Sequence, residues 1–180
     1  MDKEVKLIEG CLAGKRKAQN ELYTRFAPHL YGICLRYAAN RIEAQDMLQE
    51  GFIKVFSSLS SYESKGSFEG WMKRITINNA LNHIRSKAKQ QLFTDFPDID
   101  AIPDPVPETD ESSPPPDTDT MLRLIQELPE GYRMVFNLYV FEDYTHKEIA
   151  EAAGISENTS KTQLMRARNL LQKKLHELQR

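Results

Sequence analysis

Residues 145–164 read THKEIAEAAGISENTSKTQL, and this stretch decides the fold of the C-terminal part of the chain. Thr145 followed three residues later by Glu148 is the pattern of a capping box, in which side chain and backbone satisfy each other at the start of a helix. Gly154 stands where a tight turn needs a left-handed residue, and Ser156 can cap a second helix by accepting its free amides. The stretch therefore predicts a helix-turn-helix.

The residues around the turn agree with that interpretation. Ile149 and Ile155 are expected to point inward, and the second helix is predicted over residues 157–174. From Lys161 onward the chain carries six basic residues and a single acidic one. Such a surface suits DNA phosphates and a major groove; the alternative is an ordinary helical hairpin with a solvated charged face.

A second basic helix is predicted over residues 71–89, WMKRITINNALNHIRSKAK. Its apolar residues recur at helical spacing, and it carries five cations, several asparagines and no carboxylate. Cations bind backbone phosphates and amides bind base edges, so this helix is a candidate DNA surface. A plain basic, solvated helix is the alternative.

A polar loop, SSLSSYESKGSF, precedes that helix at residues 57–68. It interleaves Tyr62 and Lys65 with serines, and such a loop can hold single-stranded DNA by stacking and charge. Phe68 and Trp71 have the spacing of core residues. Tyr62 and the serines are therefore the better candidates to contact bases.

A different surface is expected on the helix predicted over residues 43–56. Asp46, Gln49 and Glu50 align there at three- and four-residue spacing. An acidic and amide stripe of this kind repels DNA and can accept a basic protein partner, although plain solvated polarity is the alternative.

The charge of the chain is divided into three blocks. Residues 1–91 carry 15 Lys and Arg against 9 Asp and Glu, residues 92–119 carry nine acidic residues and no basic one, and residues 120–180 carry 9 against 8. The middle block holds seven of the nine prolines, which remove amide donors and force extended backbone. It predicts an acidic, flexible linker, which at about 3.3 Å per residue can reach on the order of 90 Å.

Both flanking blocks repeat apolar residues at helical spacing and lack strand alternation. We therefore predict an all-α protein of two small helical domains, residues 1–91 and 120–180, joined by the extended acidic, proline-rich linker. The second domain contains the helix-turn-helix.

Several classes of function are disfavoured. The four histidines form no ligand or triad spacing with cysteine or serine, and there is no phosphate-cradling glycine loop, so we expect no enzyme, no metal and no cofactor. Cys11 and Cys34 lie in helical apolar patterns typical of reduced thiols, with a redox-sensing pair as the alternative. No apolar run approaches the roughly 20 residues that cross a bilayer, and the charged start is unlike a signal peptide. We expect a soluble, cytoplasmic protein without membrane insertion.

In this order, the segments resemble the sigma-70 family, specifically its extracytoplasmic-function (ECF) subgroup. Residues 31–89 look like region 2 of that family, and residues 128–175 look like region 4. The resemblance implies a sigma factor that binds core RNA polymerase through the beta-prime clamp helices and the beta flap, directs it to specific promoters and helps melt the DNA. It implies promoter DNA as a second partner, an anti-sigma factor as a candidate third, and a linker that threads through polymerase channels.

The resemblance also assigns site residues. Those matching the family's polymerase-docking positions are Asp46, Gln49, Glu50 and Phe52. Those matching the surface for the minus-ten element are Ser60, Ser61, Tyr62, Lys65, Lys73, Arg74, Asn78, Asn79 and Arg85. Those matching the surface for the minus-thirty-five element are Ser156, Thr159, Lys161, Thr162, Met165 and Arg166.

Three departures from the family pattern stand out. Asn158 and Ser160 occupy positions where the family usually has glycine and a branched apolar residue, and Asn82 replaces a usual aspartate. Ser160 is expected to weaken the packing of the recognition helix. The rival function is a conventional LuxR-type regulator, which would bind duplex DNA as a dimer without polymerase; the second basic helix and the polar loop favour the sigma factor.

Overall fold

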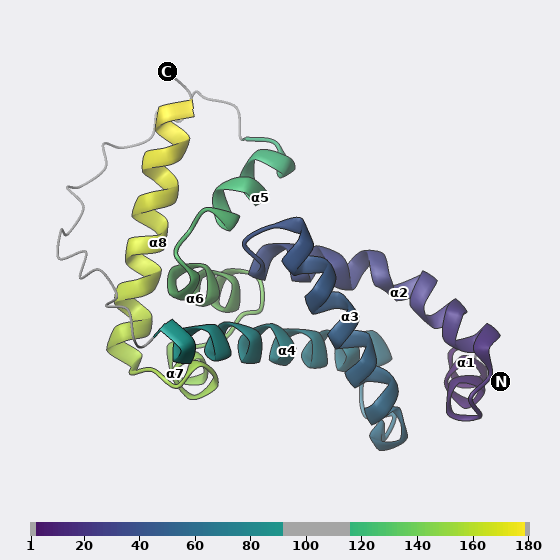
Figure 1. Ribbon diagram of the computed structural model, residues 1–180. Coiled ribbons are helices and arrows are strands. Elements are labelled where there is room, and N and C mark those ends of the chain that lie inside the picture. Colours follow the sequence, from purple (N-terminus) through teal and green to yellow (C-terminus); the bar gives the residue numbers. More distant parts are fainter. Residues whose placement is uncertain (1–2, 92–115, 179–180) are drawn as a thin grey trace. The chain divides into compact units, whose positions relative to one another are not determined.

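The computed structural model describes residues 3–91 and 116–178, and within these ranges every regular element is a helix (Figure 1). The all-α prediction is therefore confirmed. Residues 92–115, most of the predicted linker, lie outside the described residues. The elements are α1 (Lys3–Leu12), α2 (Arg16–Tyr37), α3 (Arg41–Ser58), the 3-10 turn η1 (Leu59–Ser61), α4 (Phe68–Gln91), α5 (Thr118–Gln126), α6 (Glu130–Val140), α7 (His146–Ala153) and α8 (Glu157–Leu178).

Packing divides the chain into two units, residues 1–82 and 83–180, with the division inside α4. The predicted domain limits at residues 91 and 120 stay a prediction. Helix α5 starts slightly earlier than the predicted second domain, because Asp117 caps it by accepting a 2.7 Å hydrogen bond from the amide of Thr120.

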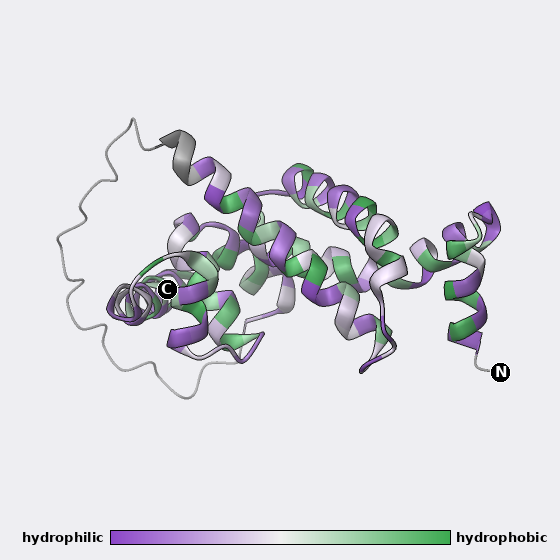
Figure 2. Ribbon diagram, turned by 90° about the horizontal axis from the view of Figure 1, so that it is seen from below, coloured by the Kyte–Doolittle hydropathy of each residue, from purple (hydrophilic) through white to green (hydrophobic). Residues whose placement is uncertain are grey.

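The first unit is built around α2, which packs against both α1 and α3. Helical periodicity predicted its apolar stripe, and Figure 2 shows hydrophobic positions interrupting hydrophilic ones along the helices. Buried residues of α2, α3 and α4 that form this core include Leu22, Leu30, Ile33, Tyr37, Ala44, Met47, Val55, Phe68, Met72 and Ala80.

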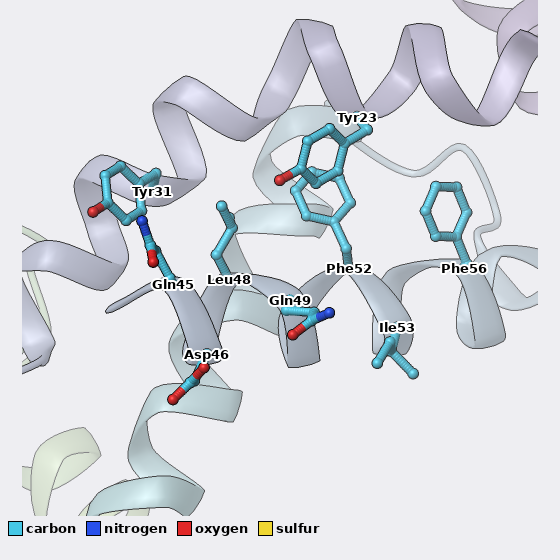
Figure 3. A pocket seen from close by; sticks show the side chains of 9 residues that line it. All are labelled: Tyr23, Tyr31, Gln45, Asp46, Leu48, Gln49, Phe52, Ile53 and Phe56. Atoms are coloured by element: carbon cyan, nitrogen blue, oxygen red, sulfur yellow. The ribbon is translucent and has the colours of Figure 1, made fainter. Parts of the chain in front are cut away.

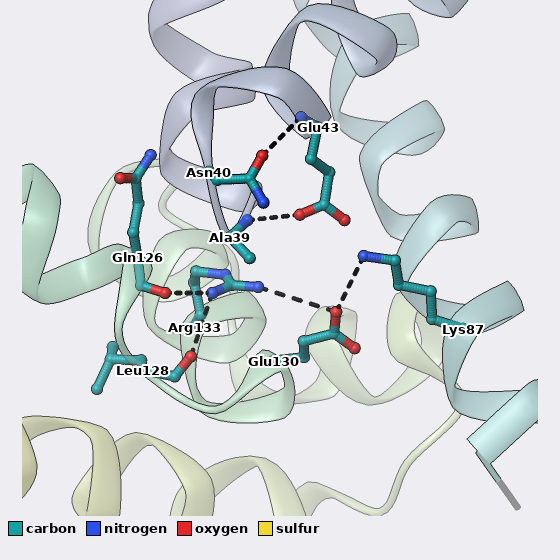
Figure 4. A network of polar contacts seen from close by, with 8 residues as sticks. All are labelled: Ala39, Asn40, Glu43, Lys87, Gln126, Leu128, Glu130 and Arg133. Atoms are coloured by element: carbon teal, nitrogen blue, oxygen red, sulfur yellow. Dashed lines mark hydrogen bonds and ion pairs between the residues drawn. The ribbon is translucent and has the colours of Figure 1, made fainter.

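Helix α3 starts at a cap that its sequence supplies. The side chain of Asn40 accepts a 3.0 Å hydrogen bond from the amide of Glu43, and the Glu43 carboxylate accepts a 2.6 Å bond from the amide of Ala39 (Figure 4). The Asn40 bond satisfies an amide that the first turn of the helix leaves without an intrahelical partner, and the Glu43 bond ties down the residue before the cap.

In the second unit, α8 packs against α5, α6 and α7. The buried side chains are Leu124, Ile125, Leu128, Met134, Val135, Leu138, Ile149, Leu164, Ala167 and Leu171. Arg133 is only 2% exposed and donates from Nη1 to the carbonyls of Gln126 at 2.6 Å and Leu128 at 3.2 Å (Figure 4). The guanidinium thus satisfies carbonyls at the end of α5, as a buried polar group must.

The contact of α1 with α2 depends on a glycine. A Cβ at Gly10 would lie 2.7 Å from the Cβ of Ala18, whereas a Cβ at Gly32 in α2 would meet nothing within 4 Å. We predict that Gly10→Ala forces the helices apart and lowers the free energy of unfolding by about 1–3 kcal/mol. Gly32→Ala is the matched control and should raise it by about 0.5–1 kcal/mol, because glycine disfavours helix interiors. Urea unfolding followed by circular dichroism measures both, and equal effects would contradict the close approach.

Candidate DNA- and protein-binding surfaces

The helix-turn-helix is formed by α7, its turn and α8, with the caps that the sequence predicts. Thr145 and Glu148 form a complete capping box, and Gly154 is left-handed with φ 70° and ψ 36°. The Ser156 hydroxyl accepts a 3.0 Å hydrogen bond from the amide of Thr159 at the start of α8. Bonds from the Thr145 amide and hydroxyl to the carboxylate lower the pKa of Glu148. The prediction of a helix-turn-helix is confirmed, and α8 extends four residues beyond its predicted end.

The predicted minus-thirty-five residues occupy the first turns of α8. Lys161, Thr162 and Met165 are exposed, Met165 by 48%. Arg166 is half-buried, and its Nη1 lies 3.4 Å from the hydroxyl of Tyr132 in α6. The three exposed side chains follow one another at one- and three-residue intervals, so they share the outward side of the helix.

The two hydroxyls nearest the turn have a structural task. Ser156 is exposed and Thr159 half-buried, and their hydroxyl oxygens lie 2.8 Å apart within the cap. Of the family departures, Asn158 is exposed, whereas Ser160 is 0% exposed. The Ser160 hydroxyl lies 2.9 Å from Nδ1 of His146, so the expected weak point is occupied by a hydrogen bond that the sequence did not reveal.

The predicted minus-ten residues of α4 divide between two environments. Arg74 and Asn78 are exposed, and Lys73 and Arg85 are half-buried. Asn79 is 2% exposed. The sequence placed all five on one DNA-facing helix, but the period of the helix turns Asn79 into the core.

Asn79 joins α4 to α3. Its amide nitrogen donates to the carbonyl of Met47 at 3.2 Å and lies 3.4 Å from a carboxylate oxygen of Glu50. Its amide oxygen accepts a hydrogen bond from the ammonium of Lys54. With these partners the Asn79 side chain acts between helices, and it is not available to bases in this conformation.

The loop before α4 is organised around aromatic rings. The Tyr62 ring lies 5.1 Å from that of Phe68 and 5.3 Å from that of Trp71, and its hydroxyl donates to the carbonyl of Gly66 at 3.0 Å. Phe68 is 0% exposed, as expected of a core residue, while Tyr62 and Trp71 are half-buried. The loop bends through left-handed backbone at Ser64, φ 56°, and at Gly66, φ 90°.

The remaining loop candidates are on the surface. Ser60 and Ser61 are exposed, and the Ser61 hydroxyl donates to the carbonyl of Ser58 at 2.6 Å. Lys65 is 85% exposed at its side chain and pairs with Glu63 at 2.6 Å. The loop therefore presents hydroxyls and one exposed cation around a half-buried ring.

The acidic stripe borders an aromatic groove of about 710 Å³ between α2 and α3 (Figure 3). The predicted Asp46, Gln49 and Phe52 line it together with Tyr23, Tyr31, Gln45, Leu48, Ile53 and Phe56. Glu50, also exposed, lies outside the lining. The groove combines an exposed carboxylate and amides with apolar side chains, a combination suited to a protein partner.

Of the apolar residues that line this groove, sequence reasoning named only Phe52. The Tyr23 ring packs against that of Phe52 in a tilted arrangement, with centroids 4.6 Å apart and an interplanar angle of 48°. Tyr23 is 45% exposed and Ile53 is 63% exposed. The signal was available, because both residues are large and apolar at positions that the helical period turns away from the core. What the sequence could not give is that α2 and α3 bring them together.

Thiols, clusters of metal-binding side chains and long apolar helices would indicate other kinds of function. Cys11 and Cys34 are buried free thiols, and burial raises the pKa of Cys34 to about 12 and that of Cys11 in the same direction, which disfavours thiolate chemistry. Across residues 3–91 and 116–178, no cluster of three or more His, Cys, Asp or Glu could hold a metal ion. Over the same part of the chain, no helix has the length and apolarity to span a membrane.

The helical fold and the basic surfaces of α4 and α8 define the class of this chain: a DNA-binding protein with a helix-turn-helix unit and a second helical unit. Sigma-70 region 2 matches residues 22–90, and sigma-70 region 4 matches residues 118–171. The chain belongs to the sigma-70 family, in its ECF subgroup.

Relatives along the whole chain agree. The RNA polymerase sigma-H factor of Pseudomonas aeruginosa is 27% identical over 99% of this chain and 97% of its own length. The ECF RNA polymerase sigma factor SigW of Bacillus subtilis is 28% identical over 96% and 97%. The fold is similar to that of the sigma factor RpoE from Bartonella quintana, solved in complex with the anti-sigma factor NepR, with a TM-score of 0.53 and 18% identity over 87% of this chain and 96% of that one.

Adjacent asparagines test the division of α4. Asn79→Ala leaves the Met47 carbonyl and the Lys54 ammonium without this partner, so we predict a loss of about 1–3 kcal/mol in the free energy of unfolding. Asn78→Ala, one position away and exposed, should stay within about 0.5 kcal/mol of the parent. Urea unfolding of the full-length variants measures both, and a neutral Asn79→Ala would argue against the bridge.

Proposed function

We propose that this chain is a sigma factor that binds core RNA polymerase, directs it to specific promoters and helps to melt DNA for transcription initiation. The observation that carries the proposal is that region 2 and region 4 matches occur in one chain together with a helix-turn-helix whose exposed face is basic. The relatives that align along its length are RNA polymerase sigma factors by name.

The upstream DNA contact is proposed for the start of α8. Lys161 can read guanine or bind phosphate, and the methyl groups of Thr162 and Met165 can meet a thymine methyl in a major groove. The exposure of these three residues supports direct contact. We retain Ser156, Thr159 and Arg166 as flanking contacts, since their cap and Tyr132 bonds hold them beside this face.

The downstream contact is proposed for α4 and the loop before it. Lys73, Arg74, Asn78 and Arg85 would follow the DNA backbone and base edges along the helix. We leave Asn79 out of this surface, because its amide is buried between α3 and α4.

The loop is proposed to trap an unstacked base. Ser60, Ser61 and Lys65 offer hydroxyls and charge, and Tyr62 offers a half-buried ring that packs against Phe68 and Trp71. Capture of a flipped base offsets an unstacking cost of a few kcal/mol, so melting needs no covalent step. The chain would therefore act as a binding factor and not as an enzyme.

The polymerase contact is proposed for the groove between α2 and α3. Asp46 and Gln49 would meet basic and polar groups of the beta-prime clamp helices, and Glu50 would extend the acidic stripe. The exposed Tyr23 and Ile53 would supply the apolar centre, with Phe52, only 4% exposed, supporting the Tyr23 ring. A beta flap contact is proposed for the second domain. An anti-sigma factor that covered the groove would compete with polymerase, and the cytoplasm is where all these partners meet.

Run-off transcription tests the function. Purified core polymerase with genomic fragments should give promoter-specific starts only when the chain is added. Failure to co-elute with core polymerase, combined with tight binding of a palindromic duplex by the chain alone, would favour the LuxR-type regulator.

Charge reversal tests the groove. Asp46→Arg should weaken co-elution with core polymerase and specific transcription at least about tenfold, because like charges across an interface repel. Glu9→Arg makes the same charge change on exposed α1 and should leave both unchanged. Asp46 is preferable to Glu50 for this purpose, since Glu50 lies beside the Asn79 amide. Undiminished transcription by Asp46→Arg would reject this docking site.

Salt dependence tests the recognition helix. If Lys161 contacts a phosphate, Lys161→Ala should reduce the slope of log affinity against log salt by about 1 in holoenzyme binding to promoter DNA. Lys15→Ala removes an equal, exposed charge outside the helix-turn-helix and should leave the slope unchanged. An unchanged slope in both variants would exclude Lys161 from phosphate contact.

A further inference from the structure

A polar bond lies inside the helix-turn-helix, where two helices meet. Ser160, in the first turns of α8, is 0% exposed, and its hydroxyl lies 2.9 Å from Nδ1 of His146, the first residue of α7. The bond joins residues 14 apart in sequence and crosses the turn at Gly154. It anchors the start of α8 directly to the start of α7.

The imidazole has a second neighbour. The His146 ring stacks on the ring of Tyr139 in α6, with centroids 4.9 Å apart and an interplanar angle of 27°. The guanidinium carbon of Arg168, farther along α8, lies 5.6 Å from the centroid of the same Tyr139 ring. These contacts form a closed circuit from α8 through α7 and α6 back to α8, which we call the clasp: Tyr139, His146, Ser160 and Arg168.

The clasp holds α8 at two levels. Ser160 and Arg168 are eight residues apart, which at about 1.5 Å per residue separates the anchors by roughly 12 Å along the axis. Lys161, Thr162 and Met165 all lie between them. The buried Ser160 bond restrains the start of the segment that carries these exposed side chains, and the exposed Arg168 side chain adds a weaker contact with Tyr139 farther along the helix.

The hydrogen bond between Ser160 and His146 restrains α8 differently from apolar packing. A hydroxyl–imidazole bond has preferred distances and angles, whereas apolar packing is non-directional. A rotation of α8 would stretch the bond and leave the buried Ser160 hydroxyl without its partner, a costly state.

We propose that the clasp positions the recognition helix and thereby determines which bases this chain prefers in the upstream promoter element. His146 and Ser160 act as positioning residues, because they hold α8 in place without presenting their own side chains to DNA. The residues that they position are Lys161, Thr162 and Met165, which form the reading face of α8. The inference rests on the proposed sigma factor function and deepens it at the upstream element.

Two substitutions of His146 separate its contacts. His146→Phe keeps a ring for Tyr139 but removes Nδ1, and His146→Asn keeps a hydrogen-bonding atom near the position of Nδ1 but removes the ring. The double variant His146→Phe, Ser160→Val replaces the polar pair with an apolar one. His176→Phe is the control, because His176 is also a half-buried histidine but lies near the end of α8.

The experiment uses holoenzyme assembled from core polymerase and each full-length variant, with a promoter library in which the upstream element and its spacing are randomised. Sequencing of the transcribed templates ranks the bases, and thermal unfolding of each variant reports folding separately. We expect His146→Phe to reduce use of the parent sequence about fivefold, the equivalent of one hydrogen bond, and to change the ranking. His146→Asn and His176→Phe should keep the parent ranking.

The double variant decides between positioning and mere stabilisation. Positioning predicts an altered ranking even though the apolar pair unfolds at or above the parent temperature. If every variant that folds keeps the parent ranking and spacing, the clasp only stabilises the unit and the inference is overturned. If the parent protein selects no promoter sequence with core polymerase, the proposed sigma factor function is contradicted. The inference is then overturned as well, because it rests on that function.

Discussion

The period of the α-helix is the constraint on which each surface of this protein depends. In small helical units a helix must bury one side in order to fold, so only the other side is available to a partner. Along α8, Ser160, Leu164 and Ala167 are buried, and Lys161 and Met165 are exposed between them. The reading face is therefore defined by the packing of the opposite face on α6 and α7.

The same constraint explains what could be predicted from sequence. Caps and turns depend on residues three or four positions apart, so Thr145 with Glu148, Gly154 and Ser156 were identifiable before the fold was known. Apolar periodicity likewise indicated the core of the first unit, whereas in the second unit the sequence analysis named only Ile149, which is buried, and Ile155, which is half-buried. Helical spacing could have placed Asn79, seven residues after the buried Met72, on the inner side of α4. Its partner was not predictable, because the Met47 carbonyl lies 32 residues away on another helix.

Where two helices form a surface together, the sequence predicts the residues on each helix but not how the two helices combine. The acidic stripe belongs to α3 alone, and its spacing is visible in the sequence, but the groove beside it requires Tyr23 of α2 to pack against Phe52 of α3. The stripe and the groove together give a partner both charge complementarity and apolar area.

A buried hydroxyl is a poor choice in the core of a DNA-binding unit only if stability is the sole criterion. A satisfied hydrogen bond adds about 0.5–1.5 kcal/mol, whereas an unsatisfied buried group costs about 1–3 kcal/mol. The bond between Ser160 and His146 therefore adds modestly to the native arrangement while penalising alternatives in which α8 is rotated or tilted. An apolar pair of equal volume would tolerate a wider range of such arrangements, because its contacts have no preferred direction. A helix that presents a few side chains to particular base edges benefits when fewer rotations and tilts are accessible to it, because the same bases are then contacted each time.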